Sequence, residues 1–448
     1  MMGKKMRLTA GLLALLLLCG CAPQTQIPSS GALYAGFGCA TLSVPTESDE
    51  PLYIAGYRQG MEITGILDAQ QVRALWLENG KTALLLLVVD CVGLGRGTVE
   101  EIRKQLDSFS KETNCRQIHV ISTHTHAGVD TLGLWGPMAV DGKNDALMET
   151  LISGAVAAAE MAYADRAAGK LYYASAQTTG LQSDSRDPQL WDDHLYQLRF
   201  IPEDGRKNGI RLFSFGAHAE ALRGDNTLVS RDYPGVVCDR IYGATGEDAI
   251  YLPGAIGGLI MTPVLTEGEF QAQENLLLTG EAIAAYALAD QNWRELGSEL
   301  ACATVEFQTP LENTIFLYYK FLGILDNDVT RTMDGKYLLT TELSVIRLGD
   351  LTLALLPGEA FPELVYGTGE NTLDAAAKAY GIGEMIVVGL ANDEIGYIVP
   401  QDDFVLHEEL PYFQEAKGDH YEETNSVGPD CAADLAEAFE AALKKLGN

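Results

Sequence analysis

Paired thiols and basic charge are both scarce in this sequence. The eight cysteines include no C-x-x-C pair, so a zinc site built from thiolates is not expected. Lys and Arg number 31 against 62 Asp and Glu, which gives a formal net charge of -31. This charge argues against nucleic acid as a partner and against docking on anionic lipid. A solvated acidic surface accounts for it without any function.

Long apolar runs are scarce as well, and the one that is present lies at the N-terminus. Three basic residues precede the apolar stretch 8–18, and Cys19-Gly20-Cys21 follows it. This pattern predicts a secretory signal over residues 1–20, too short to span a bilayer comfortably. The segment also fits a bacterial lipobox, in which Cys21 becomes the lipidated first residue of an extracytoplasmic, membrane-anchored protein. The alternative is an ordinary signal that is cleaved a few residues later.

The chain that follows contains few signs of a domain boundary. Residues 21–31 are rich in Pro, Gln and Ser, which predicts a tether. No later linker, low-complexity tract or fixed-period repeat is present. Residues 32–448 are therefore expected to form a single domain, although their length also fits two.

Short apolar runs separated by helical patterns predict an α/β fold. Buried strands are expected at residues 84–89, 117–122, 210–215, 249–252, 351–356 and 385–390. Helices are expected at residues 99–108, 147–163 and 274–289. Thr, Val, Tyr and Phe are frequent over residues 300–353 and indicate further strands. We therefore predict mixed β-sheets flanked by helices.

Polar side chains follow several of these strands at the point where each strand ends. The imidazoles of His124 and His126 follow one strand, His218 follows another, and Glu359 follows a third. Asp90, Asn392 and Asp393 occupy the same position after other strands. In open α/β sheets, ligands bind beyond the carboxyl ends of the strands, so these side chains are expected to share a cleft.

Two histidines and a carboxylate, with one position left for water, form a common catalytic zinc set. Residues two apart in extended backbone point to the same side, so His124 and His126 can enter one cleft. The candidate zinc ligands are therefore the histidines His124, His126 and His218, with Glu359 as the carboxylate. The alternatives are ordinary ones: an H-x-H pair is also typical of hydrogen-bonded core histidines, and Glu359 can cap its Pro-Gly turn.

The motifs around these residues resemble those of the neutral/alkaline, non-lysosomal ceramidases. Residues 122–128 are similar to the S-x-T-H-T-H-x-G segment of that family. The resemblance continues in order along nearly the whole chain after the tether. It is carried by Phe215–His218, Asn226–Asp232, Leu356–Glu359, Gly389–Asn392 with Tyr397, and Tyr421–Glu422 with Gly428–Pro429.

This resemblance implies the ceramidase catalytic-domain fold and a zinc-dependent hydrolase of N-acyl lipids. By matching position, it makes the zinc ligands His124, His218, Glu359 and Tyr397. It also places His126 next to the metal, Arg186 at the active-site arginine, and Tyr421 at the edge of the site. Tyr397 would otherwise be expected as a core aromatic residue, and Arg186 as a surface arginine.

One departure from the family pattern concerns the catalytic serine. Ceramidases carry a G-D-V-S-P segment whose serine lies at the scissile carbonyl. Aligned without gaps from Gly257, Ile260 takes the place of the serine and Gly258 that of the aspartate. Thr262 becomes the counterpart only if the loop is longer. Without the serine, a zinc-bound hydroxide can attack an amide or ester directly, with His126 or Tyr421 stabilising the oxyanion.

Three classes of function fit these observations: a hydrolase, a metal-bearing binding lipoprotein without catalysis, and a structural cell-surface protein. The predicted metal set favours the hydrolase, because a pure binding module needs no such ligands. A structural protein accounts for the anchor but not for those residues.

Overall fold

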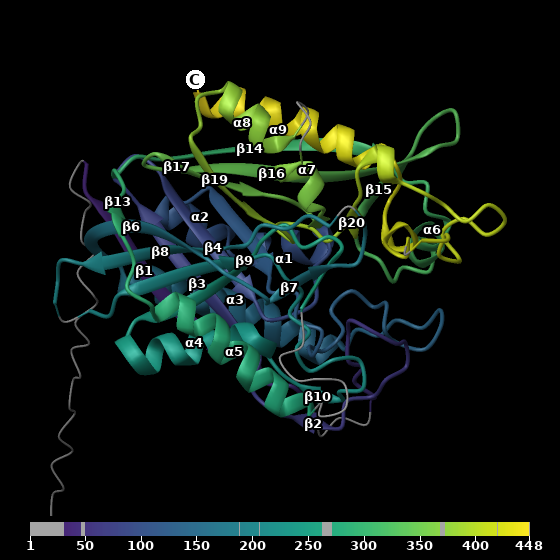
Figure 1. Ribbon diagram of the computed structural model, residues 1–448, viewed down its shortest axis with the longest axis horizontal. Coiled ribbons are helices and arrows are strands. Elements are labelled where there is room, and N and C mark those ends of the chain that lie inside the picture. The colour runs from purple at the N-terminus through teal and green to yellow at the C-terminus, as the bar shows by residue number, and fades with distance from the viewer. Residues whose placement is uncertain are drawn as a thin grey trace, which may run out of the picture.

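Figure 1 shows the computed structural model of the chain. It describes residues 31–45, 50–187, 189–205, 207–261, 271–367, 372–418 and 420–447. The predicted signal, Cys21, nearly all of the tether and Thr262 lie outside these residues. Among the helices in the described ranges, none is both long and apolar enough to cross a membrane.

The larger of two main sheets has nine strands, in the order β11-β9-β8-β6-β1-β3-β4-β5, with β13 paired to β6. Its strands are β1 (Leu33–Thr41), β3 (Gln71–Glu78), β4 (Ala83–Val89), β5 (Gln117–Ser122), β6 (Ala167–Gln177), β8 (His194–Pro202), β9 (Ile210–Phe215), β11 (Asp248–Pro253) and β13 (Arg294–Glu295). The β4–β5 and β9–β11 pairs are parallel, whereas the others are antiparallel, so the sheet is mixed.

The second main sheet has five strands in the order β14-β16-β17-β19, with β15 paired to β16. Its strands are β14 (Leu300–Pro310), β15 (Asp328–Arg331), β16 (Tyr337–Leu348), β17 (Leu351–Leu355) and β19 (Glu384–Val388). The β17–β19 pair is parallel. Asn313 begins helix α6 (Thr314–Phe321) within this region, because its side chain accepts hydrogen bonds from the backbone N–H groups of Ile315 and Phe316.

The two sheets pack face to face around a shared apolar core (Figure 1). Leu84 and Leu86 of β4 lie in the same buried cluster as Leu353 and Leu355 of β17. Because side chains alternate along a strand, Leu85 points to the opposite face and packs under helices. Each face that points away from this shared core is covered by helices, which gives a four-layer α/β/β/α arrangement.

Helices cover the outer faces of both sheets. The larger sheet is covered by α1 (Arg96–Gln105), α2 (Asp107–Thr113), α3 (Asp145–Asp165), α4 (Asp232–Thr245) and α5 (Ala272–Leu288). The smaller sheet is covered by α8 (Leu373–Ala379) and α9 (Cys431–Gly447). The predicted fold class, mixed sheets flanked by helices, is confirmed.

Several short elements tie together the loops between the long strands. The paired short strands are β2 (Gly65–Ile66) with β10 (Leu228–Val229), β7 (Gln182–Asp184) with β12 (Leu259–Met261), and β18 (Glu359–Ala360) with β20 (Tyr397–Ile398). The remaining helices are α7 (Pro362–Tyr366), η1 (Gln401–Asp403) and η2 (Glu422–Asn425).

Each of the six predicted strands coincides with a strand, but one predicted helix is wrong in its extent. The helix expected over residues 99–108 ends at Gln105, and a second helix begins at Asp107. Leu106 between them is fully buried, whereas no residue of the second helix is. The break therefore keeps Leu106 in the core while the chain turns onto the surface.

Candidate functional site

Short backbone bridges join the loops that follow separate strands. Thr125, after β5, forms a parallel bridge with Ala219, after β9, and the backbone N–H of His126 donates to the Ala219 carbonyl at 2.9 Å. Glu359 and Tyr397 are direct partners in the parallel β18–β20 pair. These bridges bring residues that lie far apart in the sequence to one edge of the fold.

Three imidazoles and one carboxylate meet at this edge. His218 Nε2 lies 2.9 Å from Glu359 Oε2, and His124 Nε2 lies 3.3 Å from the same oxygen. His126 Nε2 is 3.1 Å from His124 Nε2. His124, His218 and Glu359 are buried, whereas His126 is half-buried. The structure thus brings together the three histidines and Glu359, which were predicted to share a cleft because each follows the end of a strand.

The ring nitrogens that face away from this centre are held by backbone carbonyls. His124 Nδ1 donates to the Val92 carbonyl at 2.6 Å, and His218 Nδ1 donates to the Leu259 carbonyl at 2.5 Å. With a metal ion bound, a proton on Nδ1 would leave the Nε2 lone pair free to coordinate it, as in a metal-binding imidazole.

The separations between these donor atoms agree with a zinc centre. Tetrahedral zinc ligands bind at roughly 2.0–2.1 Å, so neighbouring ligand atoms lie about 3.3 Å apart. Glu359 Oε2 lies 2.9 Å and 3.3 Å from the two imidazole Nε2 atoms, close to that spacing. The nitrogens of His124, His126 and His218 also lie close enough together to hold one metal ion. The residues present therefore fit a divalent metal of the zinc type.

Two tyrosine hydroxyls extend this cluster. Tyr397 OH lies 3.4 Å from His218 Nε2 and 3.3 Å from Tyr421 OH. Burial, followed by the charge of Glu359, raises the pKa of Tyr397, and burial with the charge of Glu422 raises the pKa of Tyr421. Both phenols are therefore neutral hydrogen-bond donors in this environment.

The charges inside the cluster differ from one group to the next. Burial opposes ionisation of Glu359, but His124 and His218 outweigh it and hold the pKa of Glu359 well below its ordinary value. Burial and then the neighbouring imidazoles lower the pKa of His126, which is therefore neutral. Burial, followed by the charge of Glu359, raises the pKa of Glu394 well above its ordinary value.

Two residues beside His126 were not predicted from the sequence. The ring of Tyr57 packs edge-on against His126 with centroids 5.2 Å apart, and its hydroxyl donates to Glu220 Oε2 at 2.6 Å. Gly56 makes this packing possible, because a Cβ there would lie 2.5 Å from His126 Cγ. Glu220 follows His218 at a spacing of two residues, and this spacing is the signal that could have identified it.

Arg186 is buried, and acidic side chains surround its guanidinium. Nη2 donates to Glu422 and Glu423 at 2.8 and 2.7 Å, and Nη1 donates to Asp403 Oδ2 at 2.9 Å. Among the described residues, every hydrogen bond of the guanidinium goes to these three acidic residues. The structure therefore places Arg186 beside the segment that carries Tyr421, in contact with neither the imidazoles nor Glu359.

Ile260, which aligns with the family's serine, directly follows a residue that contacts His218. Ile260 is half-buried and follows Leu259, whose carbonyl accepts the hydrogen bond from His218. Gly258 has a φ of +72°, where an aspartate would be strained. Thr262, the other candidate, lies outside the described residues.

The other polar residues at strand ends have partners of their own. Asp90 lies 3.7 Å from Arg73 and accepts from a backbone N–H, and Asn392 donates to His119 at 3.2 Å. Asp393 accepts from a side-chain amide and two backbone N–H groups. None of these contacts is to His124, His126, His218 or Glu359, so the described contacts do not join these three residues to the imidazole cluster.

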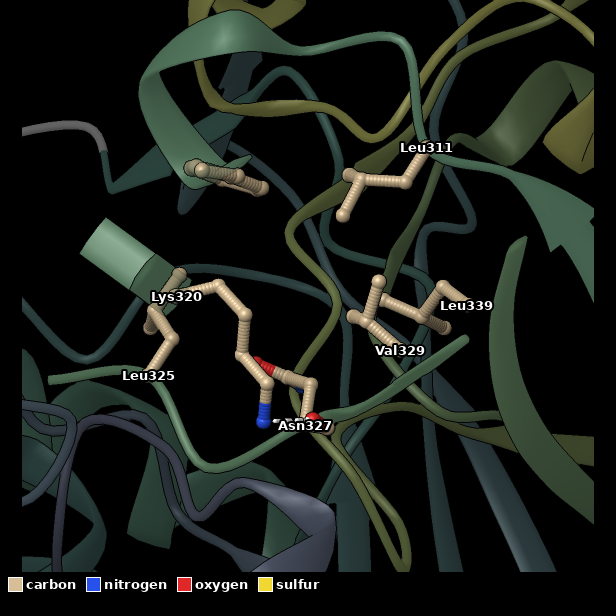
Figure 2. Close-up of a pocket in the computed structure, with 7 residues that line it drawn as sticks. Leu311, Lys320, Leu325, Asn327, Val329 and Leu339 are labelled. Carbon is tan, nitrogen blue, oxygen red and sulfur yellow. Dashed lines mark hydrogen bonds between the residues drawn. The ribbon is translucent and has the colours of Figure 1, made fainter. Parts of the chain in front are cut away.

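A separate hollow lies beside α6 and the smaller sheet (Figure 2). It is lined by Leu311, Phe316, Lys320, Leu325, Asn327, Val329 and Leu339. The Lys320 amine points to the Asn327 carbonyl and donates a hydrogen bond to it. None of the predicted site residues lines this hollow, so it plays no part in the candidate site.

Comparison with known proteins identifies the fold. No protein-family profile and no curated protein sequence matches the chain. Neutral ceramidase from Pseudomonas aeruginosa superposes with a TM-score of 0.73 at 16% identity, covering 93% of this chain and 75% of that one. The structure of a ceramidase complexed with C2 gives a TM-score of 0.72 at 16% identity, covering 92% and 75%. The chain therefore has the fold of the neutral ceramidases.

Proposed function

We propose that this protein is a zinc-dependent hydrolase that cleaves an amide bond in an N-acyl lipid, or an ester. The supporting observation is the pair of buried imidazoles whose Nδ1 atoms are held by backbone carbonyls and whose Nε2 atoms face an ionised Glu359. The zinc ligands in this proposal are His124, His218, Glu359 and Tyr397. The shared fold with ceramidases supports the substrate class.

The chain's own residues divide the remaining tasks. A bound zinc ion supplies Lewis acidity and lowers the pKa of its water to about 7. His126 is neutral and half-buried, so its imidazole is available to orient the substrate carbonyl and to stabilise the developing oxyanion. The neutral Tyr421 hydroxyl can donate to the developing oxyanion.

Water is the nucleophile that these residues support best. Ile260 has no atom that can attack a carbonyl, and it occupies the position aligned with the family's serine. Thr262 stays the alternative nucleophile. A metal-bearing binding protein without catalysis is the second candidate function, and the apolar side chain of Ile260 is the observation that favours it.

A lipid anchor on Cys21 completes the proposal. Such an anchor would hold the enzyme at the extracytoplasmic face of a membrane, where N-acyl lipids are available as substrates.

Hydrolysis of N-acyl sphingosine by the purified protein tests the activity directly. We expect amine release that stops with a zinc chelator and returns when zinc is added. Zinc bound at one equivalent without any turnover would instead identify the binding protein. No zinc and no turnover would contradict both functions.

A further inference from the structure

We propose that Arg186 is a positioning residue, which sets the place of the Tyr421 hydroxyl and does not bind the substrate. This inference rests on the proposed function, because the place of Tyr421 matters only in a working site. It concerns a residue whose position in the family pattern would put it in contact with substrate.

The guanidinium of Arg186 is fully occupied by hydrogen bonds to acidic side chains. Nε and Nη2 both donate to Glu422 Oε2, at 3.1 and 2.8 Å, and Nη2 also donates to Glu423 Oε2 at 2.7 Å. Nη1 donates to Asp403 Oδ2 at 2.9 Å. All three guanidinium nitrogens are therefore engaged with carboxylates, and the side chain is only 4% exposed. A substrate group would have to displace one of these ion pairs.

The three acidic partners lie on two segments that flank a long loop. Asp403 lies before the loop, and Glu422 and Glu423 lie after it. Glu423 Oε1 also links the two ends of the loop, because it accepts a hydrogen bond from the Val405 backbone N–H at 3.0 Å and lies 3.0 Å from His420 Nδ1. Arg186 thus fastens the base of the loop between residues 403 and 422.

Tyr421 is attached directly to this fastened base. It precedes Glu422 in the chain, and its hydroxyl lies 3.3 Å from that of Tyr397. A second route runs through Phe361, whose ring lies 5.0 Å from the guanidinium carbon and 6.2 Å from the Tyr397 ring. A shift of Glu422 therefore shifts the hydroxyl that faces the zinc ligands.

Loss of the guanidinium would force such a shift. Glu422 and Glu423 are 0% and 1% exposed, so without Arg186 two buried carboxylates lose their cation. An uncompensated buried charge is strongly unfavourable, and the segment must move to hydrate it. Small displacements of a catalytic group cost about 100-fold in rate.

The test is a set of variants assayed on N-acyl sphingosine with the zinc-loaded full-length protein. Arg186→Met is expected to lower kcat by about 100-fold with KM little changed. The same substitution in a Tyr421→Phe background should have almost no further effect, because the hydroxyl it displaces is already gone. Adding Glu422→Gln to Arg186→Met should restore part of kcat, since it removes one unpaired charge.

Arg166→Met is the matched control. Arg166 also pairs with a glutamate, at 3.0 Å, lies over a tyrosine ring, and has a side chain only 7% exposed. This variant should keep the wild-type kcat. The proposal is overturned if Arg186→Met raises KM rather than lowering kcat, or if it costs the same factor in the Tyr421→Phe background.

Hydrogen exchange of residues 420–425 separates this inference from the proposed function. Exchange there should rise in Arg186→Met and not in Arg166→Met, whether or not the protein hydrolyses any substrate. If the wild-type protein hydrolyses no substrate but Arg186→Met still exchanges faster than wild type, the positioning role of Arg186 is supported and the hydrolase function is contradicted. Unchanged exchange in Arg186→Met would overturn the positioning role itself.

Discussion

At the residue scale, His124 shows how backbone conformation serves the site. Its φ of +61° lies in the left-handed region, which costs a residue with a side chain of order 1–3 kcal/mol. In this conformation the ring reaches the Val92 carbonyl through Nδ1 and Glu359 through Nε2. The bridge between Thr125 and Ala219 holds the strained turn in place.

Asp393 gives a pH-dependent prediction at the same scale. Burial, followed by the charge of Asp326, raises the pKa of Asp393 to about 7, and Arg96 and Glu394 donate backbone N–H groups to it. The folded state then binds a proton more tightly than the unfolded state, in which the pKa is near 3.9. The free energy of unfolding should fall as pH rises from about 4 to 7, by up to about 4 kcal/mol from this group.

The variant Asp393→Asn isolates that contribution, because the amide cannot ionise. Urea unfolding of both proteins at pH 5 and pH 8 should show the wild type losing more stability than the variant between the two values. An equal loss in both would mean that Asp393 is ionised in the folded protein at pH 5 already.

At the element scale, the apolar runs made the long strands predictable, and the strand ends made the histidines and Glu359 predictable. The rest of the site depends on loops. Tyr57 reaches Glu220 across 163 residues, and Arg186 reaches Glu422 across 236 residues. No local pattern encodes such pairs, because they form only after the sheets have packed.

Strand β12 gives a prediction about the nucleophile. Its residue Leu259 holds His218 through the backbone carbonyl, and Ile260 is the next residue along the strand. If Ile260 occupies the nucleophile position, Ile260→Ser should raise turnover of N-acyl sphingosine above the wild-type level. Adding Gly258→Asp, as in the family pattern, should lower stability by about 1 kcal/mol, because the backbone there is left-handed.

Thr262→Ala provides the comparison for that assay. If Thr262 is the nucleophile, this variant abolishes turnover while Ile260→Ser changes little. An increase in Ile260→Ser, with Thr262→Ala unaffected, supports the alignment without gaps.

At the scale of the whole molecule, two face-to-face sheets provide a rigid base whose strand ends present the site. The fold class followed from alternating strands and helices in the sequence. The sequence showed neither the pairing of the two sheets through a shared core nor the strand order, since both depend on long-range packing.

The membrane anchor is a prediction about the whole molecule. Cys21→Ser removes the residue that lipidation requires, so the protein should move from the membrane fraction to the soluble fraction. The measurement is the distribution of the protein after cell fractionation, with Cys39→Ser as the control. Unchanged membrane association of Cys21→Ser would contradict the lipid anchor.

The central claim is that His124, His218, Glu359 and Tyr397 bind zinc, and X-ray absorption at the zinc edge tests it most directly. For the zinc-loaded protein, the account predicts imidazole nitrogen and oxygen ligands at roughly 2.0–2.1 Å. The imidazole signal should weaken in His124→Ala and His218→Ala and persist in the control His407→Ala, because His407 lies in neither of the two groups of described side chains that could hold a metal ion. Sulfur ligands near 2.3 Å, or a spectrum indifferent to both substitutions, would contradict the site.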